Sequence, residues 1–432
     1  DTASVLLCDD EKTYRFIEAM ITSITGSLRS KRIHVGMDEA MDLGLGRFLQ
    51  QHGYENGFSI IRRHLNRVME ILRRHGLHPM MWSDMYFRLA SKTGDYYDLE
   101  GQVPKEVIET APKDMDLVYW DYYHEDEGFY EEYIKRHKEF PGRVVFAGGL
   151  WSWSTMVIHN GHALRTSIPA LKQCRKQGVD EVYATVWGDD GAECAQMSSL
   201  LGLQLYAEYT FSSDVSMELL KDRFAACTGE DMDAFLALSR MDVLEEAPAG
   251  DPLPPDESYA TRELLYNDVL LDLYGKNYEN RNLREHYQEL SGKLKAYGEK
   301  SPGCREIFAA ASLLADFMTD KCGISSQLRK AYEADDRKTL KELADVTLPA
   351  LIRKVEALRA AWREQWFAYN KPFGFELLDI RFGGISARLE TAAVRIREYL
   401  NGDTDRIEEL EAEHLPMDSV YAWANMLSGS TL

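Results

Sequence analysis

The alternation of short hydrophobic runs with amphipathic helical stretches over the first 205 residues limits the possible fold more than any other feature of the chain. The runs are rich in β-branched and aromatic residues, which favour strands. We expect strands at 32–38, 79–84, 117–122, 144–149 and 181–187. Helical patterns lie between them at 13–28, 58–76, 130–140 and 163–178, the second and fourth ending on a glycine. This order predicts βα units around a parallel sheet.

Consecutive βα units followed by a long helical region predict an α/β fold, the last five units of a (β/α)8 barrel and then an all-α domain. A barrel without its first three strands would leave two long sheet edges and part of its core uncovered. We therefore expect an upstream segment or a second chain to complete the barrel. An open five-stranded doubly wound sheet is the alternative.

The sequence changes character after about residue 214, where long helical patterns replace strand signals. They occupy 263–274, 283–297, 304–320, 340–370 and 385–401. The segment 247–255, rich in proline and glycine, is expected to separate the early helices from the late ones. We predict two domains, a partial catalytic barrel at 1–205 and a helical domain at 206–432 that gives structural support or an oligomer contact.

Charge and composition exclude several classes of partner. The formal net charge of −21 opposes binding to nucleic acid and to anionic lipid. No apolar stretch approaches the length of about 18 residues that spans a bilayer, so no membrane partner is expected. The six cysteines are scattered, and no spacing resembles a metal site, so we expect neither metal nor cofactor. Dispersed thiols favour the cytoplasm, although the possibility of an upstream signal peptide stays open.

Each predicted strand ends in an aromatic or acidic cluster, and these clusters hold five of the eight tryptophans. They are His34 to Glu39, Trp82 to Asp84, Trp120 to Tyr123, Trp151 to Trp153 and Trp187 to Asp190. The carboxyl ends of barrel strands converge on one mouth, where active sites form. Indole faces stack on sugar rings and carboxylates accept from sugar hydroxyls, so the pattern predicts a carbohydrate site.

The adjacent acids Asp38 and Glu39 are the sharpest local signal. Neighbouring side chains in a strand point to opposite faces, so both acids can serve one site only where the strand gives way to its loop. Gly36 permits a close backbone approach there. Two carboxyls in a partly dry pocket have their pKa values pushed apart, which suits one for acid catalysis and leaves the other ionised. The structural alternative is that Asp38 caps the following helix and Glu39 lies in its first turn.

The segment from His34 to Glu39 resembles the signature His-x-Gly-x-Asp-Glu of glycoside hydrolase family 20, the β-hexosaminidases. The stretches Gly44 to Leu49 and Trp82 to Phe87 are similar to a bacterial subgroup with an all-helical C-terminal domain. The resemblance covers essentially the whole chain and is strongest from Ile33 to Glu193. It places His34 to Glu39 at the fourth strand of the barrel.

The resemblance implies a retaining exo-β-N-acetylhexosaminidase that acts on glycans ending in N-acetylglucosamine or N-acetylgalactosamine. Asp38 would orient the 2-acetamido group, whose oxygen attacks the anomeric carbon, and Glu39 would be the acid and then the base. The remaining expected substrate-binding residues are His34, Trp82, Asp84, Trp120, Tyr122, Trp151, Trp187 and Asp189.

Two of these assignments depart from the family pattern. Asp189 stands where the family often has a glutamate that binds sugar hydroxyls, which leaves Asp190 and Glu193 as rival candidates. Tyr122 is assigned to the family's acetamido-binding tyrosine, although it lies one strand early. The family's arginine and His/Asp pair of the first and third strands have no counterpart in this chain.

Two other functions remain open at this stage. A conventional retaining glycosidase would use Glu39 as acid and Asp84 or Asp189 as a nucleophile that attacks carbon directly. A sugar-binding or assembly module would bind without turnover.

Overall fold

The computed structural model describes residues 1–432 except 1, 3, 190, 245–259 and 418–432. The chain divides into two compact units. The barrel unit is Asp1–Gly148 with Thr166–Thr185, and the helical unit is Gly149–Arg165 with Val186–Leu432. The predicted domain boundary at residue 205 stays a prediction.

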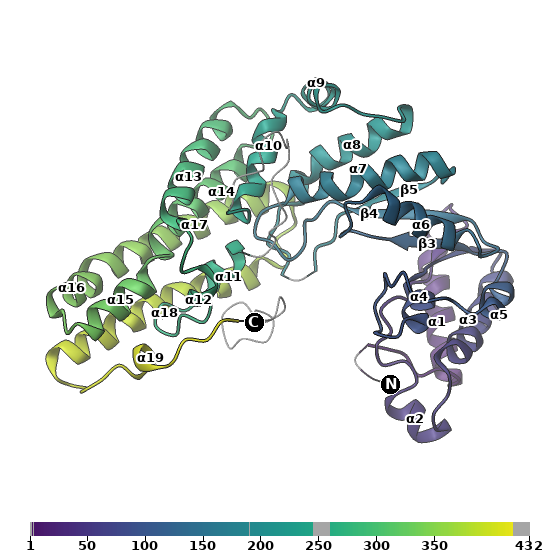
Figure 1. The fold of residues 1–432 in the computed structure, drawn as a ribbon, viewed down its shortest axis with the longest axis horizontal. Helices are drawn as coiled ribbons and strands as arrows, with labels where there is room; N and C mark the ends of the chain where they lie inside the picture. Colours follow the sequence, from purple (N-terminus) through teal and green to yellow (C-terminus); the bar gives the residue numbers. More distant parts are fainter. Residues whose placement is uncertain (1, 3, 190, 245–259, 418–432) are drawn as a thin grey trace. The chain divides into compact units, whose positions relative to one another are not determined.

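The strands form one parallel sheet in chain order, which confirms the predicted α/β class (Figure 1). They are β1 (Arg32–His34), β2 (His78–Trp82), β3 (Asp116–Trp120), β4 (Val144–Gly149) and β5 (Val182–Thr185). Ile33 pairs with Pro79, and Met81 with Leu117. A doubly wound sheet would reverse its strand order at a switch point, so the sequential order indicates a curled partial (β/α)8 barrel instead.

One helix precedes the first described strand and the others connect the strands, as the alternation predicted. They are α1 (Glu11–Thr25), α2 (Gly46–His52), α3 (Gly57–Arg74), α4 (Asp84–Ala90), α5 (Lys105–Thr110), α6 (Glu127–His137) and α7 (Asn160–Gln177). The Asp10 and Asp126 carboxylates accept from backbone N–H groups in the first turns of α1 and α6, which fixes where these helices begin. Gly76 and Gly178 follow α3 and α7 with φ of +62° and +66°, the left-handed conformation that ends a helix.

The core of the barrel unit lies between the sheet and α3. Leu65, Met69 and Leu72 recur at helical spacing on the buried face of α3. They belong to one cluster with Met81 of β2 and Leu117 of β3. Burial of this apolar surface is the main source of the unit's stability.

The strand β1 is shorter than predicted, because it ends at His34 instead of residue 38. Gly36, Met37 and Glu39 have φ of +71°, +74° and +44°, values that no strand tolerates. The candidate acids therefore lie in the loop that follows the strand.

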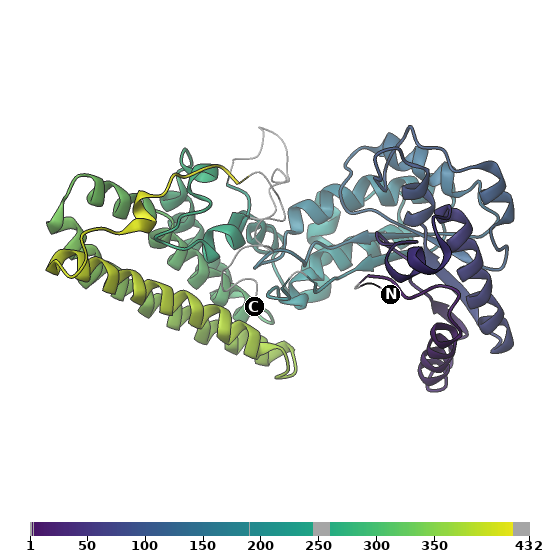
Figure 2. The ribbon, with the colours of Figure 1, turned by 90° about the horizontal axis from the view of Figure 1, so that it is seen from below.

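The helical unit consists of helices among the residues that the structure describes, as predicted. Its helices begin with α8 (Leu200–Phe211), α9 (Met217–Thr228), α10 (Met232–Leu238), α11 (Ala260–Tyr266), α12 (Gly275–Tyr278), α13 (Leu283–Lys300) and α14 (Arg305–Lys321). They continue with α15 (Ile324–Glu333), α16 (Arg337–Glu342), α17 (Leu348–Tyr369), α18 (Phe375–Asn401) and α19 (Glu408–Glu411). Packing runs from α13 to α14, from α14 to α17 and from α17 to α18. Figure 2 shows the 27-residue α18 along one side of this unit.

Three predicted helices differ from the structure. The predicted helix at 385–401 begins earlier, at Phe375. The predicted helix at 263–274 ends at Tyr266, because the Asp268 carboxylate accepts from the backbone N–H groups of Leu270 and Leu271 and Asp272 has φ of +49°. The predicted helix at 340–370 contains a π-helical turn at Leu343–Thr347. The predicted linker 247–255 lies outside the described residues. Within the described chain, no helix combines the length and the hydropathy needed to cross a membrane.

Candidate active site

The loop after β1 leaves the sheet at once yet stays tied to β2. The Val35 N–H donates to the Met80 carbonyl at 2.8 Å, and the Trp82 N–H donates to the Gly36 carbonyl at 3.1 Å. The left-handed turn at Gly36 and Met37 then redirects the chain. This turn places the neighbouring acids Asp38 and Glu39 outside strand geometry, where their side chains need not point to opposite faces.

Asp84 holds the loop from the end of β2. It is the first residue of α4, and its side chain is only 5% exposed. Its Oδ2 accepts from the Glu39 N–H at 2.9 Å. Residues 39 and 84 are thus joined at the tips of adjacent strands, as a barrel mouth requires.

The pKa of the Asp84 carboxyl is raised from 3.8 to about 7, chiefly because burial disfavours its charged form. The Glu39 N–H lowers this pKa, the charge of Asp38 raises it, and the Trp120 indole lowers it. The carboxyl therefore carries a proton in a large fraction of molecules at neutral pH.

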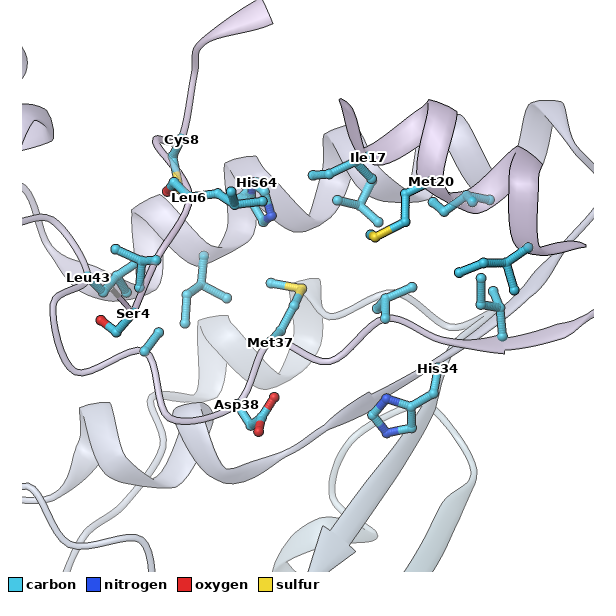
Figure 3. A pocket seen from close by; sticks show the side chains of 18 residues that line it. Ser4, Leu6, Cys8, Ile17, Met20, His34, Met37, Asp38, Leu43 and His64 are labelled. Atoms are coloured by element: carbon cyan, nitrogen blue, oxygen red, sulfur yellow. The ribbon is translucent and has the colours of Figure 1, made fainter. Parts of the chain in front are cut away.

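Asp38 lines an apolar cavity of about 600 Å³ in the barrel unit. In Figure 3, Asp38 and His34 lie along one side of this cavity, and Ile17 and Met20 of α1 lie opposite. Desolvation by these surroundings raises the pKa of Asp38, and its own backbone N–H lowers it. The cavity also runs beside β1, which is an edge strand of the described sheet and is hydrogen-bonded to β2 on its other side.

His34 contacts Trp82 across the tips of β1 and β2, with ring centroids 4.4 Å apart. Burial lowers the pKa of His34 to about 4, so the ring is neutral at physiological pH. Its Nδ1 accepts from the Gly36 N–H at 3.1 Å, which places the proton on Nε2. That Nε2 is buried and has no hydrogen-bond partner among the described residues.

An aromatic cluster surrounds the end of β3. The Trp120 ring stacks on Tyr122 at 5.3 Å and meets Tyr96 at 5.5 Å and Tyr97 at 5.6 Å. The Tyr97 hydroxyl donates to the Trp120 carbonyl at 3.0 Å. Tyr122 is 6% exposed and Trp120 is 9% exposed, so both rings are largely covered.

Tyr96 is a candidate site residue that sequence reasoning missed. Burial raises its pKa, and the negative charges of Glu39 and Asp84 raise it further, which places its hydroxyl in the field of the site's acids. It lies in the loop between α4 and α5, distant in the sequence from the end of any described strand. The adjacent pair Tyr96 and Tyr97 was the available signal in the sequence.

The loops that follow β4 and β5 belong to the helical unit. Trp151 is 3% exposed, and its ring packs on His162 at 4.3 Å and Trp153 at 4.6 Å. The Ser152 hydroxyl donates to the Trp187 carbonyl at 2.7 Å, which joins the two loops. Trp187 is 39% exposed.

The predicted site residues thus divide between the two units. The barrel unit holds the acids and most of the aromatic residues, namely His34, Asp38, Glu39, Trp82, Asp84, Trp120 and Tyr122. The helical unit holds Trp151, Trp187 and Asp189. Asp189 is exposed, Glu193 is buried, and Asp190 lies outside the described residues. The roles of all these residues in binding or catalysis stay predictions.

The barrel unit's arrangement suits acid–base chemistry. Glu39 is solvent-exposed at a strand tip, so it can exchange protons with a ligand and with water. Asp38 adds a second carboxyl beside it. Among the described residues, no group of three or more His, Cys, Asp or Glu side chains is placed to hold a metal ion.

Comparison with known proteins gives two matches to models of one family. Residues 1–133 match the catalytic domain of glycosyl hydrolase family 20. Residues 233–427 match the glycoside hydrolase 20C C-terminal domain. No curated protein matches the chain significantly. With a partial (β/α)8 sheet, adjacent acids at the tip of its first described strand and both family matches, the chain belongs to glycoside hydrolase family 20, and it is a glycoside hydrolase with a helical C-terminal domain.

Proposed function

We propose that the protein is a retaining exo-β-N-acetylhexosaminidase that hydrolyses terminal N-acetylglucosamine or N-acetylgalactosamine by substrate-assisted catalysis. The observation that carries the proposal is the position of Asp38 and Glu39 in the left-handed loop after β1, with the Glu39 N–H bonded to Asp84. The family matches support hydrolysis of a glycosidic bond.

In this mechanism, the oxygen of the substrate's own acetamido group attacks the anomeric carbon. Glu39 donates a proton to the departing oxygen, and an oxazolinium ion forms with no covalent bond to the protein. Glu39 then takes a proton from a water molecule as the water oxygen attacks the anomeric carbon. This attack opens the oxazolinium ring and restores the β configuration. Asp38 orients the acetamido group and, when ionised, stabilises the positive charge on the ring.

The state of Asp84 argues against the first rival mechanism. A nucleophilic carboxylate must be ionised and must reach the anomeric carbon. Asp84 is buried, one of its oxygens accepts from the Glu39 N–H, and its pKa is raised to about 7. These features suit a residue that supports the loop. Asp189 remains the carboxylate that a conventional mechanism would need.

We further propose that additional βα units cover the β1 side of the sheet in the active enzyme. Ile33, Val35 and Met37 line the apolar cavity there together with α1. A strand and a helix of a neighbouring βα unit would bury this surface and pair the strand edge. The mass of the native polypeptide tells whether the same chain or a second chain supplies these additional βα units. The protein to assay is the enzyme with these units present.

The test is hydrolysis of aryl 2-acetamido-2-deoxy-β-glucosides that differ in leaving-group acidity. Glu39→Gln removes the acid, so turnover of the least acidic leaving groups should fall by about 10²- to 10⁴-fold and that of the most acidic ones far less. Asp38→Ala should slow all of them, because the internal nucleophile is no longer held. Glu106→Gln, an exposed acid on α5, is the matched control and should leave turnover unchanged. Undiminished turnover in both site variants would show that the assignment is wrong.

Two probes separate the proposed mechanism from its rivals. A thiazoline analogue of the oxazolinium ion should inhibit tightly, and a 2-fluoro sugar should leave no covalent label on the protein. A label on Asp189 or Asp84 would establish the conventional mechanism. Tight sugar binding without turnover by the complete protein would indicate a binding module.

A further inference from the structure

We propose that Glu193 is a positioning residue, through which helices of the C-terminal domain hold the loop 186–195 that carries Trp187 and Asp189. The inference rests on the proposed function, because it takes these two side chains to contact the sugar. Glu193 lies between the two segments that match the family models, so neither match covers it.

The Glu193 carboxylate is completely enclosed by charged and polar partners within the helical unit. Its Oε2 accepts from Arg262 at 3.2 Å, and its Oε1 accepts from Arg381 at 2.8 Å and from the Tyr266 hydroxyl at 3.2 Å. The side chain of Glu193 is 0% exposed, and those of Arg262 and Arg381 are 1% and 8% exposed. Both carboxylate oxygens are therefore occupied, and Glu193 cannot bind a sugar hydroxyl while this arrangement holds.

The backbone around Glu193 is held by the same helices. The Trp362 indole N–H on α17 donates to the Glu193 carbonyl at 3.2 Å. Arg381 on α18 also donates to the Gly191 carbonyl at 2.9 Å. Arg262 and Tyr266 belong to α11. Side chains of three helices, α11, α17 and α18, therefore bind this one loop.

The loop contains one residue in a strained backbone conformation beside the ion pair. Ala192 has φ of +57°, a left-handed value that is unfavourable for a residue with a Cβ. Such strain persists only where surrounding contacts determine the backbone. Gly191 has φ of +122°, and a Cβ there would lie 2.2 Å from Glu193 Oε2 and 2.4 Å from Arg262 Nη2. The ion pair therefore packs directly on the loop backbone.

The anchored stretch is close in sequence to the candidate sugar ligands. Asp189 precedes Gly191 by two residues, and the Trp187 carbonyl is fixed separately by the Ser152 hydroxyl. The exposed Asp189 thus lies between two fixed carbonyls, that of Trp187 and that of Gly191. This assigns the family's hydroxyl-binding position to Asp189 and gives Glu193 the role of holding it.

The first measurement is hydrogen exchange of the backbone N–H groups in the loop, which needs no activity. Glu193→Gln removes the charge that two buried arginines require, so exchange in residues 186–195 should accelerate by about tenfold or more. Exchange in α13, which supplies none of the four side chains that hold this loop, should stay unchanged. Asp379→Asn, which lies on α18 as Arg381 does, is the matched control, since it breaks an exposed ion pair with Arg359 of α17 and should leave the loop protected. Unaltered exchange in Glu193→Gln would overturn the inference.

The second measurement is the division between KM and kcat for the aryl glycoside. Misplacing Asp189 and Trp187 weakens their contacts to the sugar in the ground state and in the transition state alike. KM should therefore rise about tenfold, which corresponds to the loss of one strong hydrogen bond, and kcat should change little. General destabilisation would reduce the amount of active enzyme without this division. A loosened loop with an unchanged KM would overturn the positioning role while the proposed function stands. A wild-type protein that binds sugar without turnover would refute the proposed function, and the exchange experiment would still decide whether Glu193 anchors the loop.

Two further variants keep the test decisive if Glu193→Gln fails to fold. Arg381→Lys keeps the charge but cannot serve both Gly191 and Glu193 equally well, so it should loosen the loop in a folded protein. The double variant Glu193→Gln with Arg381→Met removes one surplus charge and should recover part of the stability that Glu193→Gln loses. If Arg381→Lys leaves both loop exchange and KM unchanged, the inference is wrong.

Discussion

Replacement of Asp84 by asparagine should make the barrel unit more stable in alkaline solution relative to the wild type. The Asp84 pKa is raised to about 7 in the folded protein, against 3.8 ordinarily. A carboxyl that binds its proton more tightly when folded stabilises the fold in acid, and this contribution is lost as the pH rises from about 4 through about 7. Asparagine is neutral at every pH, and its amide oxygen still accepts from the Glu39 N–H.

The magnitude follows from the shift. Ionising Asp84 in the folded state costs about 4 kcal/mol at pH 8, because a shift of one pKa unit is worth about 1.36 kcal/mol. At pH 5 the folded and unfolded states differ in proton binding over only a little more than one pH unit, so the cost is about 1 to 2 kcal/mol. The free energy of unfolding of Asp84→Asn minus that of the wild type should therefore rise by about 2 to 3 kcal/mol between pH 5 and pH 8.

The assay is urea unfolding at several pH values, followed by hydrogen exchange of peptides from α3 and β2 so that the barrel unit is read separately. Asp116→Asn is the control of opposite sign. Asp116 is also buried, at 4% exposed, and burial alone would raise its pKa. Hydrogen bonds from Arg143 and His78 outweigh burial and lower the pKa, so its stabilising effect is present above the ordinary pKa and lost in acid. A difference between Asp84→Asn and wild type that stayed constant from pH 5 to pH 8 would refute the reasoning.

Three other substitutions test the packing and the electrostatics. Gly142→Ala would place a Cβ 2.1 Å from the Met115 carbonyl oxygen, so it should destabilise the barrel unit by about 2 kcal/mol or more, seen as a lower urea midpoint, and an unchanged midpoint would contradict the contact. Gly36→Ala has room for its Cβ, 3.5 Å from Asp38 Oδ1, so its cost of about 1 kcal/mol should come from the positive φ alone, and an asparagine at the same position should cost less in the same titration. Burial lowers the pKa of Lys321 from 10.5 to about 8. Below pH 8 the buried ammonium group therefore destabilises the fold, and this destabilisation decreases as the pH rises from 8 toward 10.5. Relative to Lys321→Met, the wild-type helical unit should therefore gain about 2 to 3 kcal/mol of stability between pH 7 and pH 10, and a flat difference would show that Lys321 is not desolvated.

The parts of the fold that depend on local pattern were predictable from the sequence. The alternation of hydrophobic runs and helical stretches predicted five parallel strands and the helices between them, because side-chain spacing reports which face of an element is buried. The glycines Gly76 and Gly178 marked helix ends, since a left-handed residue terminates a helix. The departures occurred where side chains or backbone strain overrode propensity, as at Met37 after β1 and Asp268 after α11.

The candidate site was predictable only in part. The order His34, Gly36, Asp38, Glu39 identified the loop after β1 and the family, because these residues follow one another within six positions of the sequence. The sequence did not indicate that Tyr96 lies in the electrostatic field of Glu39 and Asp84, since a loop tyrosine carries no periodic signal.

By itself the sequence determined the class of fold, the positions of most elements and the adjacent acids at a strand tip, because these depend on neighbours within a few residues. The tertiary structure alone decided the protonation of Asp84 and the distinction between Asp189 and Glu193. Glu193 meets Arg262 and Arg381 at separations of 69 and 188 residues along the chain. Burial and ion pairing at such separations depend on how helices pack, and local sequence does not report the packing partner of a residue.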